Sequence, residues 1–424
     1  MSLPKSFNLA EAIPSLPEGS TGNLVSVRPV SGSTFLPSSI IDFDLPSGRG
    51  WLDPTSLAIR YKATTTSDVS GCVMIGCPLY TPFARLQLTV GGVQIDSISQ
   101  YNQVMQVMLN EKYDVAGKYG KLACFGYSNA TPGNVQYLDG RISPAGSADN
   151  YYCAGELPCI VSNSEKMIPL FACGAIRISL TLDTLANMFF NNGATYNVAS
   201  AFSLSNIEVV FNLMDLGKGV ETLVKGMGPR LFLKSHSYNN SATACPSGTV
   251  GSQSYVFNQR YSSIRSAFVC ANRVVGSKWG EICDLTSGAG DLQLQIGSIN
   301  YPSNVLSSVL NDSGCLQETQ RAFNNLYSGA TMSINTNEWL VGANTATASL
   351  NYYESGKAIF GINLEKCQST DHVMMSGVST YNSPINVVIN CPTATTNACN
   401  LNLILDYDAI IVIDQESSSL SVRS

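Results

Sequence analysis

Charged residues are scarce in this chain: Asp, Glu, Lys and Arg together make up 13% of its 424 residues, against roughly 25% in an average soluble domain. The hydrophobic fraction of 44% is ordinary, so Ser, Thr, Asn, Gln and Gly must supply most of the polar surface. Such a surface repels its neighbours weakly, because it carries little charge. The composition therefore favours either a protein that packs against copies of itself or a secreted β-protein with a neutral surface.

A basic arm is also lacking. The chain has 24 Lys and Arg against 30 Asp and Glu, a net charge of −6, and neither end holds a cluster of cations. Proteins that neutralise a nucleic acid need many cations close together, because their affinity comes from counterion release at the phosphates. Direct, extensive binding to nucleic acid is therefore not expected.

The cysteines form no recognisable framework. There are 13, an odd number, with no Cys-x-x-Cys pair, and a chain of this length does not depend on disulfides for its core. Several lie in apolar runs, as in 268–270, where a thiol behaves as a small hydrophobe. We expect reduced thiols and folding in a reducing, cytosol-like compartment. The pairs Cys72/Cys77 and Cys153/Cys159 have the wrong spacing for a zinc knuckle.

Signals for export and membrane insertion are missing as well. The first residues, Met1–Asn8, contain no apolar core of a signal peptide. No apolar run approaches the ~18–20 residues that a membrane-spanning helix requires. We expect neither a secretory leader nor a transmembrane segment.

Catalytic signals are weak. The chain has two histidines, His236 at the end of an apolar run and His372 in a polar segment, and both are interpreted as surface or loop residues. A triad whose partners lie far apart in sequence stays open, but no Gly-x-Ser-x-Gly elbow supports one.

Metal and phosphate motifs are incomplete. Asp42-Phe43-Asp44 lacks the glycine and the distal glutamate of a calcium loop, so these carboxylates are interpreted as solvated strand-end groups. Gly217-Lys-Gly219 and Gly226-Met-Gly228 lack the other positions of a phosphate-binding loop and suit hinges. We therefore predict no catalytic, cofactor-binding or metal-binding residue, no cofactor and no enzymatic activity.

Paired tyrosines leave one binding function open. Tyr151–Tyr152 and Tyr352–Tyr353 could stack on sugars. Stacking on bases is not expected without a basic groove around them. Packing in a core or an interface is the preferred interpretation.

What the chain does have is many short β-type runs between segments rich in Gly, Pro, Asn and Ser. Several alternate apolar and polar residues, which is typical of a half-buried strand. Many short strands with irregular connections indicate sandwiches or barrels. The expected strands are Ile40–Phe43, Leu57–Tyr61, Arg85–Val90, Ala175–Leu182, Ile207–Leu213, Leu231–Leu233, Ile264–Cys270, Leu292–Ile299, Ala358–Ile362, Asn386–Ile389 and Leu401–Ile413.

One of these strands recurs. Leu86–Ile95 (LQLTVGGVQI) resembles Leu292–Tyr301 (LQLQIGSINY) at an offset of 206 residues, close to half the chain. The preceding strand recurs loosely, Leu57–Tyr61 against Ile264–Phe268. The alternative is two unrelated β-domains with a chance match, but recurrence at half the chain length favours a duplicated domain.

A short helix is expected after each copy. In the first half Tyr101, Val104, Met105 and Met108 have helical spacing, and in the second half Leu306, Val309 and Leu310 do, after Pro302. The predicted unit is therefore strand, glycine turn, short helix, occurring twice.

The segment 215–228 between the halves predicts a linker helix, ended by Gly228-Pro229. We divide the chain into an N-terminal arm, 1–22, a first sandwich, 23–225, and a second sandwich, 226–424. Long polar stretches near 115–160 and 325–350 are interpreted as exposed towers or contacts with neighbours.

This layout resembles the double jelly-roll major capsid proteins of the PRD1 and adenovirus lineage, in particular the small members from virophages and polinton-like viruses. The resemblance rests on Arg85–Asp96 with its following helix, the repeat at Leu292 and the linker at 215–228. It implies an all-β chain of two tandem, antiparallel, eight-stranded jelly-roll sandwiches with short helices in the loops.

The resemblance also implies a function. Three chains would form a homotrimer of six jelly rolls, a pseudo-hexagonal capsomer that tiles the icosahedral shell of a double-stranded DNA virus, next to penton and minor capsid proteins. The arm would link trimers beneath the shell, and other proteins would contact the genome. Because fold alone does not fix function, the alternative is a carbohydrate- or receptor-binding β-sandwich, a lectin or a spike. A β-sandwich hydrolase is the third possibility, and a single-sandwich coat is disfavoured by the length and the repeat.

Overall fold

The structure is a computed structural model of the whole chain. It describes residues 19–66, 72–74, 79–111, 140–141, 148–191, 201–273, 282–283, 291–307, 312–324, 359–366, 375–391 and 398–424. In this part of the chain the backbone forms mainly antiparallel strands, with a few short helices, as the strand-type runs in the sequence predict.

The first half of the chain forms one set of sheets. A seven-stranded sheet has the order β10-β5-β14-β4-β11, with β1 and β2 also paired to β14, and a four-stranded sheet has the order β3-β12-β7-β8. A small sheet, β13-β6-β9, lies beside them. The strands are β1 (Thr21–Val27), β2 (Thr34–Phe35), β3 (Ile40–Asp44), β4 (Trp51–Leu52), β5 (Ala58–Thr66), β6 (Cys72–Met74), β7 (Phe83–Val90), β8 (Val93–Ser99), β9 (Gly140–Arg141), β10 (Ala148–Glu156), β11 (Ile168–Pro169), β12 (Ile176–Leu182), β13 (Phe189–Asn191) and β14 (Ala201–Asp215).

The second half forms another set. Its larger sheet has the order β15-β23-β17-β18, with β21 on β17 and β24 on β23, and its four-stranded sheet has the order β16-β22-β19-β20. The strands are β15 (Arg230–Cys245), β16 (Gly251–Phe257), β17 (Ile264–Arg273), β18 (Ile282–Cys283), β19 (Asp291–Ile296), β20 (Ile299–Ser307), β21 (Phe360–Asn363), β22 (Ile385–Cys391), β23 (Cys399–Asp414) and β24 (Ser419–Arg423).

The two halves have the same plan, which confirms the predicted pair of tandem sandwiches. In each, one long strand, β14 or β23, pairs with an earlier strand, β5 or β17. These earlier strands contain the loosely similar segments Leu57–Tyr61 and Ile264–Phe268. In each four-stranded sheet, the strand β7 or β19 has the strand β12 or β22 on one side and its hairpin partner, β8 or β20, on the other. The short strands β2, β4 and β11 extend the first sandwich beyond the expected set.

The recurring segment is a tight hairpin in both halves. Gly91 and Gly92 join β7 to β8 with φ of 57° and 84°, and Gly297 (φ 63°) begins the turn between β19 and β20. Glycine adopts such positive φ angles without a steric penalty, and two-residue hairpins of this kind need them. The repeat is therefore strand, glycine turn, strand. The prediction that Leu292–Ile299 is one strand was wrong, because the chain reverses at 297–298.

The helices agree with prediction in the first half only. α1 (Tyr101–Met105) continues into η3 (Gln106–Glu111), and Tyr101, Val104, Met105 and Met108 are all buried, as their spacing predicts. In the second half the helix predicted at Leu306 is wrong, because this residue lies in β20. The helix there, α5 (Asp312–Ala322), begins later, and Val309 and Leu310 lie outside the described residues.

Three short helical segments remain. The linker predicted at 215–228 forms α4 (Lys218–Gly226), which confirms a helix between the halves. α3 (Leu185–Met188) precedes β13, and η2 (Pro54–Ser56) precedes β5. The predicted arm, 1–22, is described only from residue 19, and its last two residues, Thr21 and Gly22, begin β1.

The polar stretch near 115–160 was predicted to be a loop. Part of it is a strand instead, because it contains β10, which pairs with the whole of β5. Residues 112–139 and 142–147 of this stretch, and all of 325–350, lie outside the described residues.

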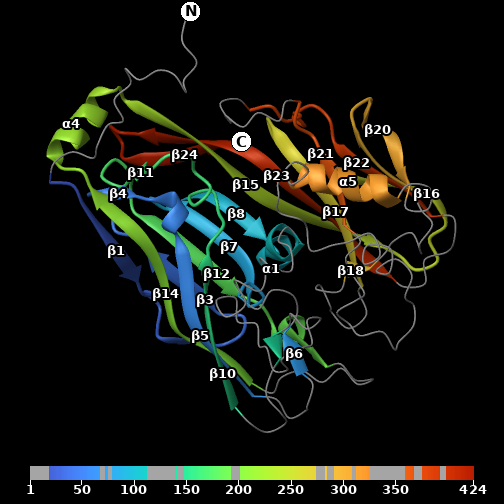
Figure 1. Cartoon of the computed structure of the whole chain (residues 1–424), viewed down its shortest axis with the longest axis horizontal. Helices are drawn as coiled ribbons and strands as arrows, with labels where there is room; N and C mark the ends of the chain where they lie inside the picture. The colour runs from blue at the N-terminus through green and yellow to red at the C-terminus, as the bar shows by residue number, and fades with distance from the viewer. Residues whose placement is uncertain are drawn as a thin grey trace, which may run out of the picture.

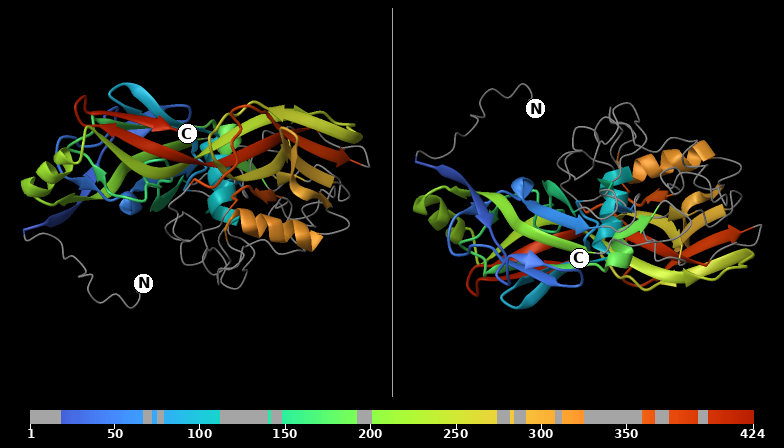
Figure 2. Two further views of the ribbon diagram at one scale, coloured as in Figure 1. Left: turned by 90° about the horizontal axis from the view of Figure 1, so that it is seen from above. Right: turned by 90° about the horizontal axis from the view of Figure 1, so that it is seen from below.

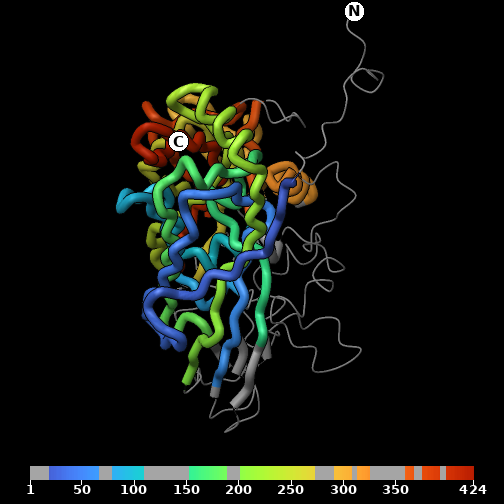
Figure 3. The backbone as a smooth tube through the Cα atoms, turned by 90° about the vertical axis from the view of Figure 1, so that its left-hand side faces the viewer, coloured from blue at the N-terminus to red at the C-terminus, as the bar shows by residue number. Residues whose placement is uncertain are grey.

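The two sandwiches lie side by side along the long axis of the molecule (Figure 1), with the first in blue and green and the second in yellow to red. Figure 2 shows that β15 and β23 run from the second sandwich across to the first. Figure 3 views the first sandwich from the side where α4 lies. Buried side chains of both halves form one continuous apolar cluster.

The close approach of α5 to β21 gives a stability prediction. A Cβ atom added at Gly361 would lie 2.8 Å from Cα of Thr319 and 2.9 Å from Cβ of Ala322. Gly361→Ala is therefore expected to displace α5 and lower the free energy of unfolding by about 1–3 kcal/mol in urea denaturation. The control is Gly22→Ala in β1, where an added Cβ meets nothing within 4 Å. Equal effects of the two substitutions would contradict this account of the packing.

Candidate functional site: the polar seam between the sandwiches

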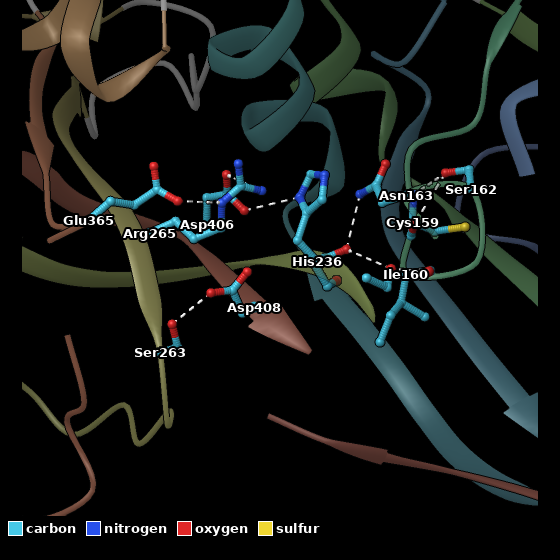
Figure 4. A network of polar contacts seen from close by, with 12 residues as sticks. Cys159, Ile160, Ser162, Asn163, His236, Ser263, Arg265, Glu365, Asp406 and Asp408 are labelled. Carbon is cyan, nitrogen blue, oxygen red and sulfur yellow. Dashed lines mark hydrogen bonds and ion pairs between the residues drawn. The ribbon is translucent and has the colours of Figure 1, made fainter. Parts of the chain in front are cut away.

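The first half of β15 belongs to one sandwich and contacts the other. β15 pairs with β23 along all 16 of its residues, while the segment 157–165 of the first sandwich hydrogen-bonds to it. The amide of Glu165 donates to the carbonyl of Lys234 over 3.1 Å, and Nδ2 of Asn163 donates to the carbonyl of His236 over 3.1 Å. Figure 4 shows Asn163 pointing at this carbonyl. We call this contact region the seam.

Two side-chain contacts reinforce the backbone contacts of the seam. The hydroxyl of Ser235 donates to the carbonyl of Ile160. Nζ of Lys234 lies 3.5 Å from the carboxylate of Glu165. Hydrogen bonds and an ion pair thus fix the register of β15 against the first sandwich.

A buried carboxylate lies at the centre of the seam. Asp96 is on β8 of the first sandwich and is 4% exposed. Its carboxylate accepts from the amide of Ile160 at 3.1 Å and from the hydroxyl of Ser237, on β15, at 2.9 and 3.0 Å. The Ser237 contact joins the two sandwiches through a charged acceptor, which strengthens the hydrogen bond.

Burial changes the protonation of Asp96. Removal of the carboxylate from water raises its pKa from 3.8 to about 6, and the hydrogen bonds from Ser237 and from the amides of Ile160 and Ser97 partly oppose this rise. No cation is among these causes; the neighbours are neutral donors and phenols such as Tyr407. These hydrogen bonds offset part of the free-energy cost of removing the ionised carboxylate from water.

A second polar group lies on the side of the second sandwich. Arg265 of β17 is 19% exposed and contacts Glu365 at 3.4 Å and Asp406 at 3.7 Å. Asp406, on β23, also contacts Nδ1 of His236 at 3.1 Å. Figure 4 shows Arg265 between the two carboxylates. The charge of Asp406 is the largest cause that raises the pKa of Arg265.

Asp408 continues this group on β23. It is 2% exposed and accepts from the hydroxyl of Ser263 at 2.6 Å. Desolvation raises its pKa, while the Ser263 hydrogen bond and the charge of Arg265 act in the opposite direction. Next to it, Tyr407 stacks on Tyr261 with ring centroids 3.9 Å apart.

The helix after the first hairpin completes the seam. Nδ2 of Asn240, on β15, donates to Oε1 of Gln100 at 2.6 Å and to Oε1 of Gln103 at 3.2 Å. The hydroxyl of Tyr101 donates to the carbonyl of Pro158 at 3.0 Å. The predicted helix thus has a structural role, since it carries contacts from one sandwich to the other.

His236 lies at a different place in its strand from the one predicted. His236 lies inside β15, half-buried against Asp406, so its interpretation as a surface histidine at a strand end was wrong. β15 continues to Cys245 through mostly polar residues, so the strand had no apolar signal after Leu233. His372 lies outside the described residues.

The carboxylates interpreted as strand-end groups belong to β3, with Asp44 as its last residue and Asp42 in its middle. Asp44 is 40% exposed and pairs with Arg177 at 2.6 Å, and the Arg177 guanidinium lowers the pKa of Asp44. Asp42 accepts from the hydroxyl of Ser179. No group of three potential metal ligands occurs among the described residues.

The other residues singled out in the sequence lie in several parts of the fold, where the structure describes them. Cys153 and Cys159 are buried thiols, and burial raises the pKa of Cys159 to about 11. Tyr152 is 70% exposed on β10. Gly217 and Gly228 flank α4 with positive φ, which suits the predicted hinges. The side chains of Tyr151, Cys72 and Cys77, and all of Tyr352–Tyr353, lie outside the described residues.

The buried charged residues of the second sandwich were not predicted as a group, although the sequence contains a signal of them. In a chain with few charges, Arg265 interrupts the apolar run Ile264–Cys270, and Asp406 and Asp408 interrupt Leu401–Ile413. Charges inside a buried strand need partners. Such charges indicate that ion pairs are buried, but they do not show which residues form each pair.

The described residues of the seam supply hydrogen bonds and one ion pair, between Lys234 and Glu165, that join the two sandwiches. Because these contacts join the sandwiches, the seam sets the relative orientation of two similar domains.

Among the described helices, none is long and apolar enough to cross a membrane.

The comparisons with known proteins agree with this architecture. No family model and no curated sequence matches the chain. Solved structures do match over nearly its whole length. A quasi-atomic model of the PBCV-1 virus capsid is 10% identical, with 98% of this chain and 99% of that chain covered at a TM-score of 0.65.

Two other solved structures match similarly. The Faustovirus major capsid protein is 10% identical over 95% of this chain and 92% of its own, with a TM-score of 0.59. The mavirus major capsid protein is 11% identical over 100% and 95%, with a TM-score of 0.56. At these identities the likeness establishes the double jelly-roll fold, with both sandwiches in the same arrangement.

Proposed function

We propose that this chain is the major capsid protein of an icosahedral double-stranded DNA virus, a structural subunit without enzymatic activity. The observation that carries the proposal is the match of both sandwiches at once to major capsid proteins, over 95% or more of this chain. A match to one sandwich alone would fit lectins and enzymes equally well. Two sandwiches in a fixed arrangement are a more specific feature.

The seam gives this arrangement a purpose. In the proposed capsomer three chains form a homotrimer, so that six similar sandwiches surround one axis. A closed ring forms only if each sandwich is rotated from the next by a fixed angle. Within a chain the contacts of Asp96 with Ser237 and of Asn240 with Gln100 and Gln103 hold that angle, and between chains the subunit interfaces would have to reproduce it.

The proposal extends to the parts around the sandwiches. We assign residues 1–22 to an arm beneath the shell, 23–225 to the first jelly roll and 226–424 to the second. The trimer would contact neighbouring capsomers, penton and minor capsid proteins within the virion, after folding in a reducing compartment of the host cell. The low charge of the chain supports a surface that packs against copies of itself.

Light scattering coupled to size-exclusion chromatography tests the proposed assembly. The expected particle has three times the 45.3 kDa mass of one chain, and its mass stays constant on dilution through the micromolar range. A monodisperse monomer at high concentration would count against the capsid proposal. If that monomer also bound a glycan array through an exposed tyrosine such as Tyr152, the lectin alternative would replace it.

A further inference from the structure

Three cysteine side chains gather at one end of the second sandwich. Cys245 is the last residue of β15 and Cys399 is the first residue of β23, and the two are direct partners across the ladder. Cys391 is the last residue of β22, in the other sheet. All three are buried, with 2–3% exposure, and Tyr255 is within electrostatic reach of all three sulfurs.

The two ladder partners are placed for a covalent bond. The thiols of Cys245 and Cys399 hydrogen-bond to each other, and the hydroxyl of Tyr255 donates to Sγ of Cys245 over 3.0 Å. Directly opposite residues of an antiparallel pair have Cα atoms roughly 4.5–5.5 Å apart. Disulfides require roughly 4.4–6.8 Å, so the separation expected of these ladder partners is compatible with a disulfide.

The pairing is specific among the strands described. Other cysteines in the described ladders face a different residue: Cys153 faces Tyr61, Cys270 faces Asn402 and Cys391 faces Gly251. We propose that Cys245 and Cys399 are a modification site, at which a reversible disulfide joins the end of β15 to the start of β23.

The oxidant is a low-molecular-weight disulfide of the glutathione class. The thiolate of one cysteine attacks a sulfur of this disulfide, whose S–S bond breaks and releases one small thiolate. The second cysteine then attacks the protein sulfur of the mixed disulfide and expels the other small thiolate. The two protons from the cysteines go to the released thiolates, so two protein thiols are oxidised and one external disulfide is reduced to two thiols.

The surroundings of the pair make this reaction slow inside a cell. The contact with Cys399 and burial both raise the pKa of the Cys245 thiol, which keeps the attacking thiolate scarce. In a reducing compartment the pair therefore stays reduced. The bond would close a loop from 245 to 399, and cross-links that close long loops stabilise most in the chain-entropy account.

The use of the site rests on the proposed function. A subunit that assembles with these cysteines reduced and is then released from the cell would acquire the bond in the oxidising exterior. The second sandwich would become harder to unfold after assembly, when folding is no longer required. The bond formation itself does not depend on the oligomeric state.

The experiment uses the full-length protein. The reduced protein is incubated with oxidised glutathione at mildly alkaline pH, denatured, alkylated and mapped by peptide mass spectrometry. The expected product is a linked pair of peptides containing Cys245 and Cys399, which dithiothreitol separates. The thermal unfolding midpoint of the oxidised protein is expected to rise by several degrees over that of the reduced protein.

Two variants assign the bond. Cys391→Ser is expected to form the same linked peptides, and Cys399→Ser is expected to lose both the link and the rise in midpoint. The proposal is overturned if Cys245 and Cys399 both remain alkylated after prolonged oxidation, or if Cys245 is linked to Cys391 instead. The particle mass from light scattering is recorded in parallel, so failure of the disulfide and failure of the trimer are seen separately.

Discussion

Replacing Arg265 by Met is expected to lower the free energy of unfolding by about 3–5 kcal/mol. The guanidinium lies against Glu365 and Asp406, whose side chains are 14% and 15% exposed. Methionine fills part of the same volume but leaves both carboxylates without the guanidinium in a poorly hydrated position. The cost comes from these uncompensated charges, since an intact buried pair by itself adds little net stability.

Urea denaturation followed by circular dichroism measures this loss, and an exposed ion pair supplies the control. Arg177 and Asp44 are 48% and 40% exposed, and Arg177→Met is expected to cost about 0–1 kcal/mol because water screens such pairs. If both substitutions cost the same, the Arg265 group is not a buried support of the second sandwich.

Replacing Asp96 by Asn is expected to change how stability depends on pH. The pKa of Asp96 is about 6 in the folded chain against 3.8 in the unfolded one, so the folded chain binds the proton more tightly. The stabilising contribution of Asp96 is therefore complete below about pH 4 and is lost as the pH rises through 6, by roughly 3 kcal/mol. Asparagine stays neutral, and its amide can still accept from Ile160 and donate to Ser237.

The two proteins should therefore have similar unfolding free energies near pH 4, with the Asp96→Asn variant increasingly more stable towards neutral pH. Comparison with the wild type isolates Asp96 from the other carboxylates. Asp44→Asn is the control of opposite sign, because Arg177 lowers the pKa of Asp44 and the wild type should gain on that variant as the pH rises. Parallel pH curves for the wild type and the Asp96→Asn variant would contradict the proposed state of Asp96.

Local signals predicted the repeated parts of the fold. The alternation of Ile176–Leu182 follows the pleat of a strand, and the burial of its residues alternates in the same way. The glycines at 91–92 and 297 mark two hairpins at equal places in the two sandwiches. Each of these features depends on residues that are close together in the chain, so it can be predicted from one sequence alone.

The same signals failed where distant contacts decide the structure. Leu306, Val309 and Leu310 have helical spacing, yet Leu306 lies in β20 because it pairs with Leu292 of β19. β15 continues through polar residues to Cys245 because it pairs with β23 along its whole length. The seam was not predicted, because Asp96 and Ser237 are 141 residues apart and no local pattern relates them.

Negative-stain imaging of the purified full-length protein tests the central claim most directly. The account predicts particles with three-fold symmetry and a nearly hexagonal outline, because each of three chains supplies two similar sandwiches. Single elongated bilobed particles at every concentration would contradict it.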